Sequence, residues 1–110
     1  MHTKATSQVI GPVYNLVMSK TATGRDLLKF TIKTWRASRN GHDKVCWWNV
    51  IAYEGNARCI HQYVKENGRM IVIDGHMDLF AVDSESPLTF QIIVEKFYFI
   101  HNGEIISDAG

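Results

Sequence analysis

The 110-residue sequence has no apolar run close to the roughly 18 residues that a helix needs to span a bilayer. Its polar start, MHTKATSQ, lacks the apolar core of a signal peptide. Internal repeats and low-complexity stretches are absent too, and the length suits a single domain. These absences predict a one-domain, cytoplasmic protein that makes no contact with a membrane.

Cysteine is scarce as well. Cys46 and Cys59 are the only two, which is too few for a disulfide framework. Together with His42 and His61 they form a loose H-x3-C-x12-C-x-H string, and zinc accepts these residue types. The spacing fits no common zinc module. We therefore expect reduced, structural cysteines, with no bound metal and no cofactor.

Patterns of catalytic residues are also missing. The five histidines are scattered along the chain, and no Ser-His-Asp or Cys-His arrangement supports a nucleophile. Asp74 and Asp78 form a carboxylate pair of the kind that a nuclease uses to hold a divalent metal, but no third ligand is evident. We therefore expect a protein that is not an enzyme.

The formal net charge is only +1, but the charges are unevenly distributed. Residues 1–45 contain eight basic and two acidic side chains, whereas residues 46–110 contain four basic and nine acidic ones. A basic half produces a local field that attracts a polyanion. The alternative is an ordinary solvated charged face.

Five apolar runs have the composition of strands and one segment has the pattern of a helix. The runs cover residues 7–18, 27–35, 45–55, 69–82 and 88–100, and the helix covers residues 56–68, with Asn56 as its N-cap and Gly68 as the C′ residue that stops it. The first run should be bent, bulged or at a sheet edge at Gly11-Pro12, and the fourth should bend at Gly75. This order predicts an all-β protein, a five-stranded OB-fold barrel with one short helix between strands 3 and 4.

The run at residues 27–35 alternates with period two. Its apolar positions fall on one face of a strand, and its other face carries Lys29, Lys33 and Trp35. The Asn40-Gly41 pair that follows favours a hairpin to the run at 45–55. The run at residues 45–55 would therefore pair with a half-buried strand whose exposed face is basic and ends in an aromatic ring.

Two adjacent tryptophans lie near the start of the run at residues 45–55. Trp47 and Trp48 must point to opposite faces of a strand, and both parities of this run are apolar. Periodicity therefore leaves open which ring lies outward.

Three blocks of the sequence, GRDLLKFTIKT, WWNVIAYEGNARCIHQYVKENGRMIVIDG and FQIIVEKFYFI, occur in an order that resembles the bacterial-type single-stranded DNA-binding protein family. The resemblance extends over residues 8–100. It implies an OB-fold domain at residues 7–100, followed by a short extension at residues 101–110, as in tailless members from phages or bacteria. It also implies sequence-independent binding of single-stranded DNA.

The resemblance assigns roles to single residues. Trp47 matches a stacking tryptophan of the family and Tyr53 the stacking aromatic six residues later, while Trp48 takes the place of a histidine and would pack inward or against a neighbouring subunit. A shift by one residue would exchange the two tryptophans. Two further stacking tryptophans have no exact match, and Trp35 and Phe80 are their stand-ins. The basic side chains expected to contact phosphates are Lys29, Lys33, Arg36, Arg39 and Lys44.

The resemblance further implies a homo-oligomer, with a tetramer favoured over a dimer and with VIGPVYNLVM and FYFI as candidate interface segments. In this hypothesis the protein coats and protects single-stranded DNA during replication, recombination or repair. Replication or recombination proteins are further candidate partners. One alternative is an OB-fold adaptor of a primosome or recombination complex that mainly binds protein, and another is an RNA-binding role.

Overall fold

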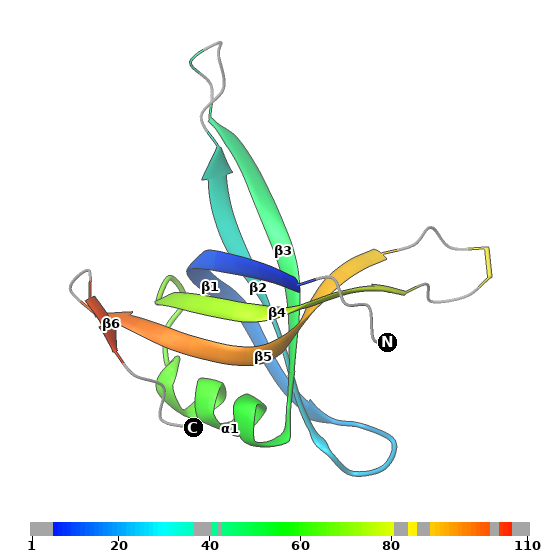
Figure 1. Ribbon diagram of the computed structural model, residues 1–110. Helices are drawn as coiled ribbons and strands as arrows, with labels where there is room; N and C mark the ends of the chain where they lie inside the picture. The colour runs from blue at the N-terminus through cyan, green and yellow to red at the C-terminus, as the bar shows by residue number, and fades with distance from the viewer. Residues whose placement is uncertain are drawn as a thin grey trace.

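The computed structural model describes residues 6–36, 41, 43–80, 84–85, 89–101 and 104–106. Within these residues, six strands and one helix follow one another along the chain (Figure 1). Their bounds are Thr6–Lys20 for β1, Asp26–Arg36 for β2, Lys44–Tyr53 for β3, Glu54–Tyr63 for α1, Met70–Phe80 for β4, Thr89–His101 for β5 and Glu104–Ile106 for β6.

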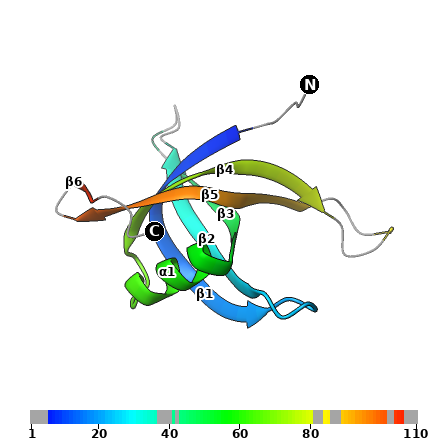
Figure 2. The ribbon, with the colours of Figure 1, turned by 60° about the horizontal axis from the view of Figure 1, so that its bottom comes forward.

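The strands form a closed barrel. Neighbours pair antiparallel in the order β3-β2-β1-β4-β5-β6, and a short parallel pairing of β3 with β5 closes the circle of the first five strands. Figure 2 shows α1 lying across one end of this barrel, in front of the strands. The predicted OB-fold, with its single helix between β3 and β4, is thereby confirmed. Within the described part of the chain, α1 falls well short of the length and apolarity needed to cross a membrane.

The barrel interior is filled by the apolar parity of each strand. Leu28, Phe30 and Ile32 of β2 are buried, as their alternation predicts, and Ile60 of α1 packs against the same core. Each fully buried aliphatic or aromatic side chain contributes about 1.5–3 kcal/mol to folding. Burial of these side chains therefore stabilises the closed barrel, and the alternate side chains of each strand face outward.

The first strand is neither bulged at Gly11-Pro12 nor at a sheet edge, which are two of the three forms predicted for it. β1 runs unbroken through Gly11-Pro12, and both residues are buried. It pairs with β4 as far as Pro12 and with β2 from Val13 onward, so it is not an edge strand. The missing N–H of Pro12 falls at the point where β1 changes its partner from β4 to β2. The irregularity lies instead between Tyr14 and Val17, where Asn15 has a left-handed φ of 59°.

The helix boundaries were also predicted wrongly. α1 begins at Glu54 directly after the strand residue Tyr53, so Asn56 lies inside its first turn rather than at the cap. The helix ends at Tyr63, and the left-handed Gly68 shapes the following turn, where its N–H donates to the carbonyl oxygen of Val13. No loop separates β3 from α1, because Glu54 turns the chain with a φ of 52°.

Other features of the sheet agree with the sequence. The expected bend of β4 at Gly75 is confirmed by a register shift between Asp74 and Gly75. The β2–β3 hairpin is confirmed by a continuous ladder that ends with Arg36 opposite Lys44, although part of its turn lies outside the described residues. β6 was not anticipated, and it pairs with the end of β5 inside the segment expected as an extension.

Gly11 is required where β1 crosses β2. A Cβ atom at this position would lie 2.5 Å from the carbonyl oxygen of Lys33 and 2.8 Å from the Ile32 Cγ2. We therefore expect Gly11→Ala to lower the free energy of unfolding by about 1–3 kcal/mol, because the strands must separate to admit the methyl group. Urea unfolding monitored by circular dichroism measures this change.

Gly55→Ala is the matched control. Gly55 lies in the first turn of α1, where the nearest atom to a Cβ is 4.0 Å away. Alanine favours a helix over glycine by up to about 1 kcal/mol, so this variant should be as stable as the wild type or more stable. Equal stabilities of the two alanine variants would contradict the role assigned to Gly11.

Candidate nucleic-acid interface

One face of the β2–β3 ribbon points away from the core. We call it the outer ribbon face. The ladder places Lys33 opposite Trp47, Trp35 opposite Val45 and Thr31 opposite Asn49 on this face. The face consists of Lys29, Thr31, Lys33 and Trp35 from β2 and Val45, Trp47, Asn49, Ile51 and Tyr53 from β3.

The structure shows which of the two adjacent tryptophans lies outward. Trp48 packs against the core, its Nε1 donates a 2.8 Å hydrogen bond to Thr34 Oγ1, and its ring meets the edge of Phe90 at 6.1 Å. Trp47 lies outward and is 52% exposed. The predicted orientation of the pair is therefore confirmed, and stacking of Trp47 on a base stays a prediction.

A lysine links the two exposed tryptophans. Lys33 Nζ lies 5.0 Å from the ring centre of Trp35 and 5.5 Å from that of Trp47. Both distances are within the range of cation–π attraction. Trp35 is 53% exposed, so the two rings and one cation form a continuous surface at the ribbon's outer end.

Tyr14 also belongs to this surface, although the sequence analysis did not single it out. Its ring meets Trp47 edge-on at 5.5 Å, and β1 pairs it with Thr31. Alternation in β1 does not predict its side, because both parities of this strand carry apolar residues. The contact holds the indole of Trp47 in one orientation without covering it.

A shallow pocket of about 260 Å³ lies between Trp47 and Tyr53 along β3. Several polar side chains line it. Asn15 Nδ2 donates to Thr31 Oγ1 at 3.1 Å, and the buried Gln91 donates from Nε2 to Asp78 Oδ2 at 3.0 Å. The pocket is lined by Asn15, Lys29, Phe30, Thr31, Asn49, Val50, Ile51 and Gln91. Its size and apolar floor suit a flat ring with polar edges.

Tyr53 marks the other end of the outer ribbon face. The Arg25 guanidinium carbon lies 5.2 Å from the Tyr53 ring centre, and Arg25 Nε is 2.9 Å from Glu54 Oε1. Tyr53 is half-buried, unlike Trp47. The face is thus open at its tryptophan end and covered at its tyrosine end.

The predicted phosphate-contacting residues are not all on one face. Lys29 and Lys33 lie on the outer ribbon face, whereas Arg36 and Lys44 face each other across the last pair of the ladder with the opposite parity. Arg39 lies outside the described residues. The predicted stacking residue Phe80 is the last residue of β4, opposite Thr89, and its side chain lies outside the described part of the structure.

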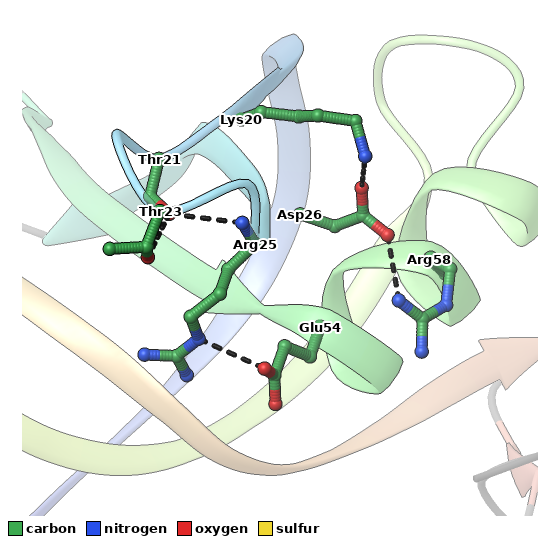
Figure 3. A network of polar contacts seen from close by, with 7 residues as sticks. All are labelled: Lys20, Thr21, Thr23, Arg25, Asp26, Glu54 and Arg58. Carbon is green, nitrogen blue, oxygen red and sulfur yellow. Dashed lines mark hydrogen bonds and ion pairs between the residues drawn. The ribbon is translucent and has the colours of Figure 1, made fainter.

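An ionic network ties the β1–β2 turn to α1 (Figure 3). Asp26 accepts from Lys20 Nζ at 2.9 Å and from Arg58 Nη1 at 2.7 Å. The hydrogen bond from Arg58, and then that from Lys20, hold the pKa of Asp26 below its usual value near 3.8. The network therefore fixes the start of α1 against the strand that carries Lys29.

The carboxylates considered for a metal site have other partners. Asp74 accepts from Gln8 Nε2 at 2.8 Å and Asp78 accepts from Gln91, with the β4 bulge between them. Among the residues that the structure describes, no three His, Cys, Asp or Glu side chains come together. This arrangement gives no support to metal-assisted hydrolysis.

A five-stranded OB barrel with an exposed basic and aromatic strand face defines a class of proteins that bind single-stranded nucleic acid. The model of the Single-strand binding protein family matches residues 6–100, and the chain belongs to this family. A search of curated proteins finds no match. Membership implies binding of single-stranded DNA, in a family that is not catalytic.

The lowered pKa of Asp26 makes a prediction about acid stability. A depressed pKa contributes stability that is present above the unfolded pKa and is lost as the pH falls through the folded one. The advantage of the wild type over Asp26→Asn in the free energy of unfolding should therefore be full at pH 7 and should shrink as the pH falls from about 5 toward 3. Unfolding in urea at each pH measures it.

Asp43→Asn makes the same substitution at an exposed site just before β3 and is the control. Asp43 is not part of the Asp26 network, so this variant should change the free energy of unfolding little. If Asp26→Asn shows the same profile as Asp43→Asn, the network does not stabilise the native state.

Proposed function

We propose that this protein binds single-stranded DNA without sequence preference through the outer ribbon face. The observation that carries the proposal is the surface formed by Trp35, Lys33 and Trp47, which offers two exposed rings and a cation within 5.5 Å of both. Stacking on an aromatic ring contributes about 1–3 kcal/mol per base and tolerates every base. Binding of this kind needs no recognition of base edges.

The cations supply the second contribution to binding, which is electrostatic. In this proposal Lys29 and Lys33 contact phosphates from the outer ribbon face. Arg36 and Lys44 contact phosphates from the end of the ribbon, where the bound DNA passes over the β2–β3 hairpin. Each phosphate contact releases about 0.7 counterions from a single strand. Contacts with ~4 phosphates give a salt slope near −3.

In this proposal the protein coats and protects single strands that are exposed during replication, recombination or repair, in the cytoplasm of a bacterium or of a phage host. Residues 7–100 act as the DNA-binding domain, and residues 101–110 are a short extension that starts at the end of β5. The acidic second half of the sequence favours a second candidate, an adaptor whose main partner is a replication or recombination protein. Strong binding to oligothymidine distinguishes the first candidate from the second.

The proposed protein is also a homo-oligomer, with a tetramer as the first candidate and a dimer as the second. An apolar row crosses the outside of the barrel, where the ladders place Ile10 beside Val72 and Val72 beside Tyr98. Ile10 is 50% exposed in the single chain. Val72 is already only 3% exposed, so burial of Ile10 and of the half-buried Tyr98 against a second copy is what would remove apolar surface from water.

Trp47→Ala tests the DNA-binding proposal. Loss of one stacking ring should weaken binding of a dT oligomer about tenfold, within the range that 1–3 kcal/mol allows, and should reduce quenching of tryptophan fluorescence. The titration is made at low and at high salt, and the wild type should show a slope near −3. Equal affinity of wild type and Trp47→Ala would contradict the assigned role.

Tyr63→Ala is the control for this titration, because Tyr63 is an exposed aromatic residue on α1, away from the outer ribbon face. It should bind the dT oligomer as the wild type does. A wild type that shows no quenching at low salt would refute single-strand binding and favour the protein adaptor. Tighter binding to an oligouridine of equal length would favour RNA as the ligand.

Ile10→Glu tests the oligomer. A carboxylate in the apolar row should dissociate the assembly, since a buried unpaired charge is costly, and light scattering after size-exclusion chromatography gives the mass. Val17→Glu is the control in the same strand, because Val17 is exposed but pairs with Lys29 on the other side of the barrel. Dissociation by Val17→Glu alone would move the interface to the outer ribbon face.

A further inference from the structure

The tyrosine end of the outer ribbon face is occupied by a side chain of the protein itself. The Arg25 guanidinium lies over the Tyr53 ring, with its carbon 5.2 Å from the ring centre. A planar guanidinium on an aromatic ring takes the place that a stacked base would take. A base can reach this face of Tyr53 only if Arg25 moves or stacks on the base in turn.

Glu54 holds Arg25 in that place. Its Oε1 is 2.9 Å from Arg25 Nε, and both side chains are more than half exposed. Figure 3 marks this contact with a dashed line. An exposed ion pair is weak and is screened by salt. A multiply charged strand that brings phosphates close to Arg25 can therefore compete with this single carboxylate.

The backbone at Glu54 makes its carboxylate harder to explain by stability alone. Glu54 has a φ of 52°, in the left-handed region that favours glycine, at the point where β3 turns into α1. Glycine would relieve this strain, and a weak surface ion pair offsets little of it. The position thus carries an acidic side chain beside a ring on the proposed DNA-binding face.

The neighbouring cations are differently placed. Lys20 and Arg58 both bind Asp26, which anchors the β1–β2 turn to α1 (Figure 3). Arg25 lies on the other side of this turn and is directed to Tyr53 and Glu54. Of these three cations, Arg25 is the one that contacts a ring of the outer ribbon face, that of Tyr53.

We propose that Arg25 is a displaceable cover of the Tyr53 stacking position, held by Glu54, and that a phosphate of the bound strand takes Arg25 from Glu54 when a base stacks on Tyr53. This inference rests on the proposed binding of single-stranded DNA. Arg25 is then a phosphate-binding residue that the charge pattern alone did not select. Glu54 is a positioning residue that weakens binding at this end of the face.

The test is the affinity of the full chain for a dT oligomer, measured by fluorescence titration over a series of salt concentrations. Glu54→Gln should bind about twofold to fivefold more tightly than the wild type at low salt, which corresponds to the strength of one exposed ion pair. The gain should shrink as salt rises, because salt already screens Glu54 in the wild type. The salt slope of Glu54→Gln should therefore be steeper.

Arg25 provides the second arm of the test. Arg25→Ala should weaken binding, and in its background Glu54→Gln should give no gain, because the carboxylate then has no guanidinium to hold. Arg25→Lys should restore part of the affinity, since lysine still binds a phosphate but does not stack in the same way. Glu54→Gly removes the carboxylate and the backbone strain together, and should show the same gain in affinity as Glu54→Gln.

Glu104→Gln removes one negative charge from β6, at the far end of β5, and controls for net charge. If Glu54→Gln matches Glu104→Gln in affinity and salt slope while the wild type binds DNA, the inference is overturned and the proposed function stands. Weaker binding by Glu54→Gln also overturns it, because Glu54 would then orient Arg25 for binding. A wild type that does not bind the oligomer refutes both proposals.

Discussion

The packing of Trp48 under the β2–β3 ribbon is the contact on which the outer ribbon face depends. Trp48 reaches Phe90 on β5 and donates to Thr34 on β2, so it joins the ribbon to the rest of the barrel. Because side chains alternate along a strand, this anchor sends Trp47 outward. A slip of one residue would turn every side chain of the ribbon to the other face, and the row from Trp35 to Tyr53 would be lost.

Close approach of strands is the second constraint, and glycine satisfies it at two places. A Cβ at Gly11 would meet the backbone of β2 at Lys33, and a Cβ at Gly75 would meet the backbone of β5 at Ile93. The first contact lies directly beneath the lysine that links the two exposed tryptophans. The geometry of the outer ribbon face therefore depends on residues that have no side chain of their own.

Acidic side chains divide the cations of the β1–β2 turn between structure and surface. Asp26 is strongly engaged, with two cations within 2.9 Å, and fastens the turn to α1. Glu54 makes a single exposed contact with Arg25, which also lies over Tyr53. The same residue types thus anchor the turn at Asp26 and make only a single exposed contact at the neighbouring Arg25, because they differ in exposure and in the number of partners.

Local patterns in the sequence determined the five barrel strands, their order along the chain, the buried face of β2 and the bend of β4, because alternation and turn residues act over a few neighbours. Alternation alone left the parity of Trp47 and Trp48 open, since both sides of that run are apolar. The family resemblance predicted an outward Trp47, and the tertiary structure settled it through Thr34 and Phe90, which come from other strands. The tertiary structure also decided the irregularity of β1 between Tyr14 and Val17, the start of α1, and the meeting of Arg25 with Tyr53. These depend on which strands lie side by side once the barrel closes, and that is a property of the whole chain.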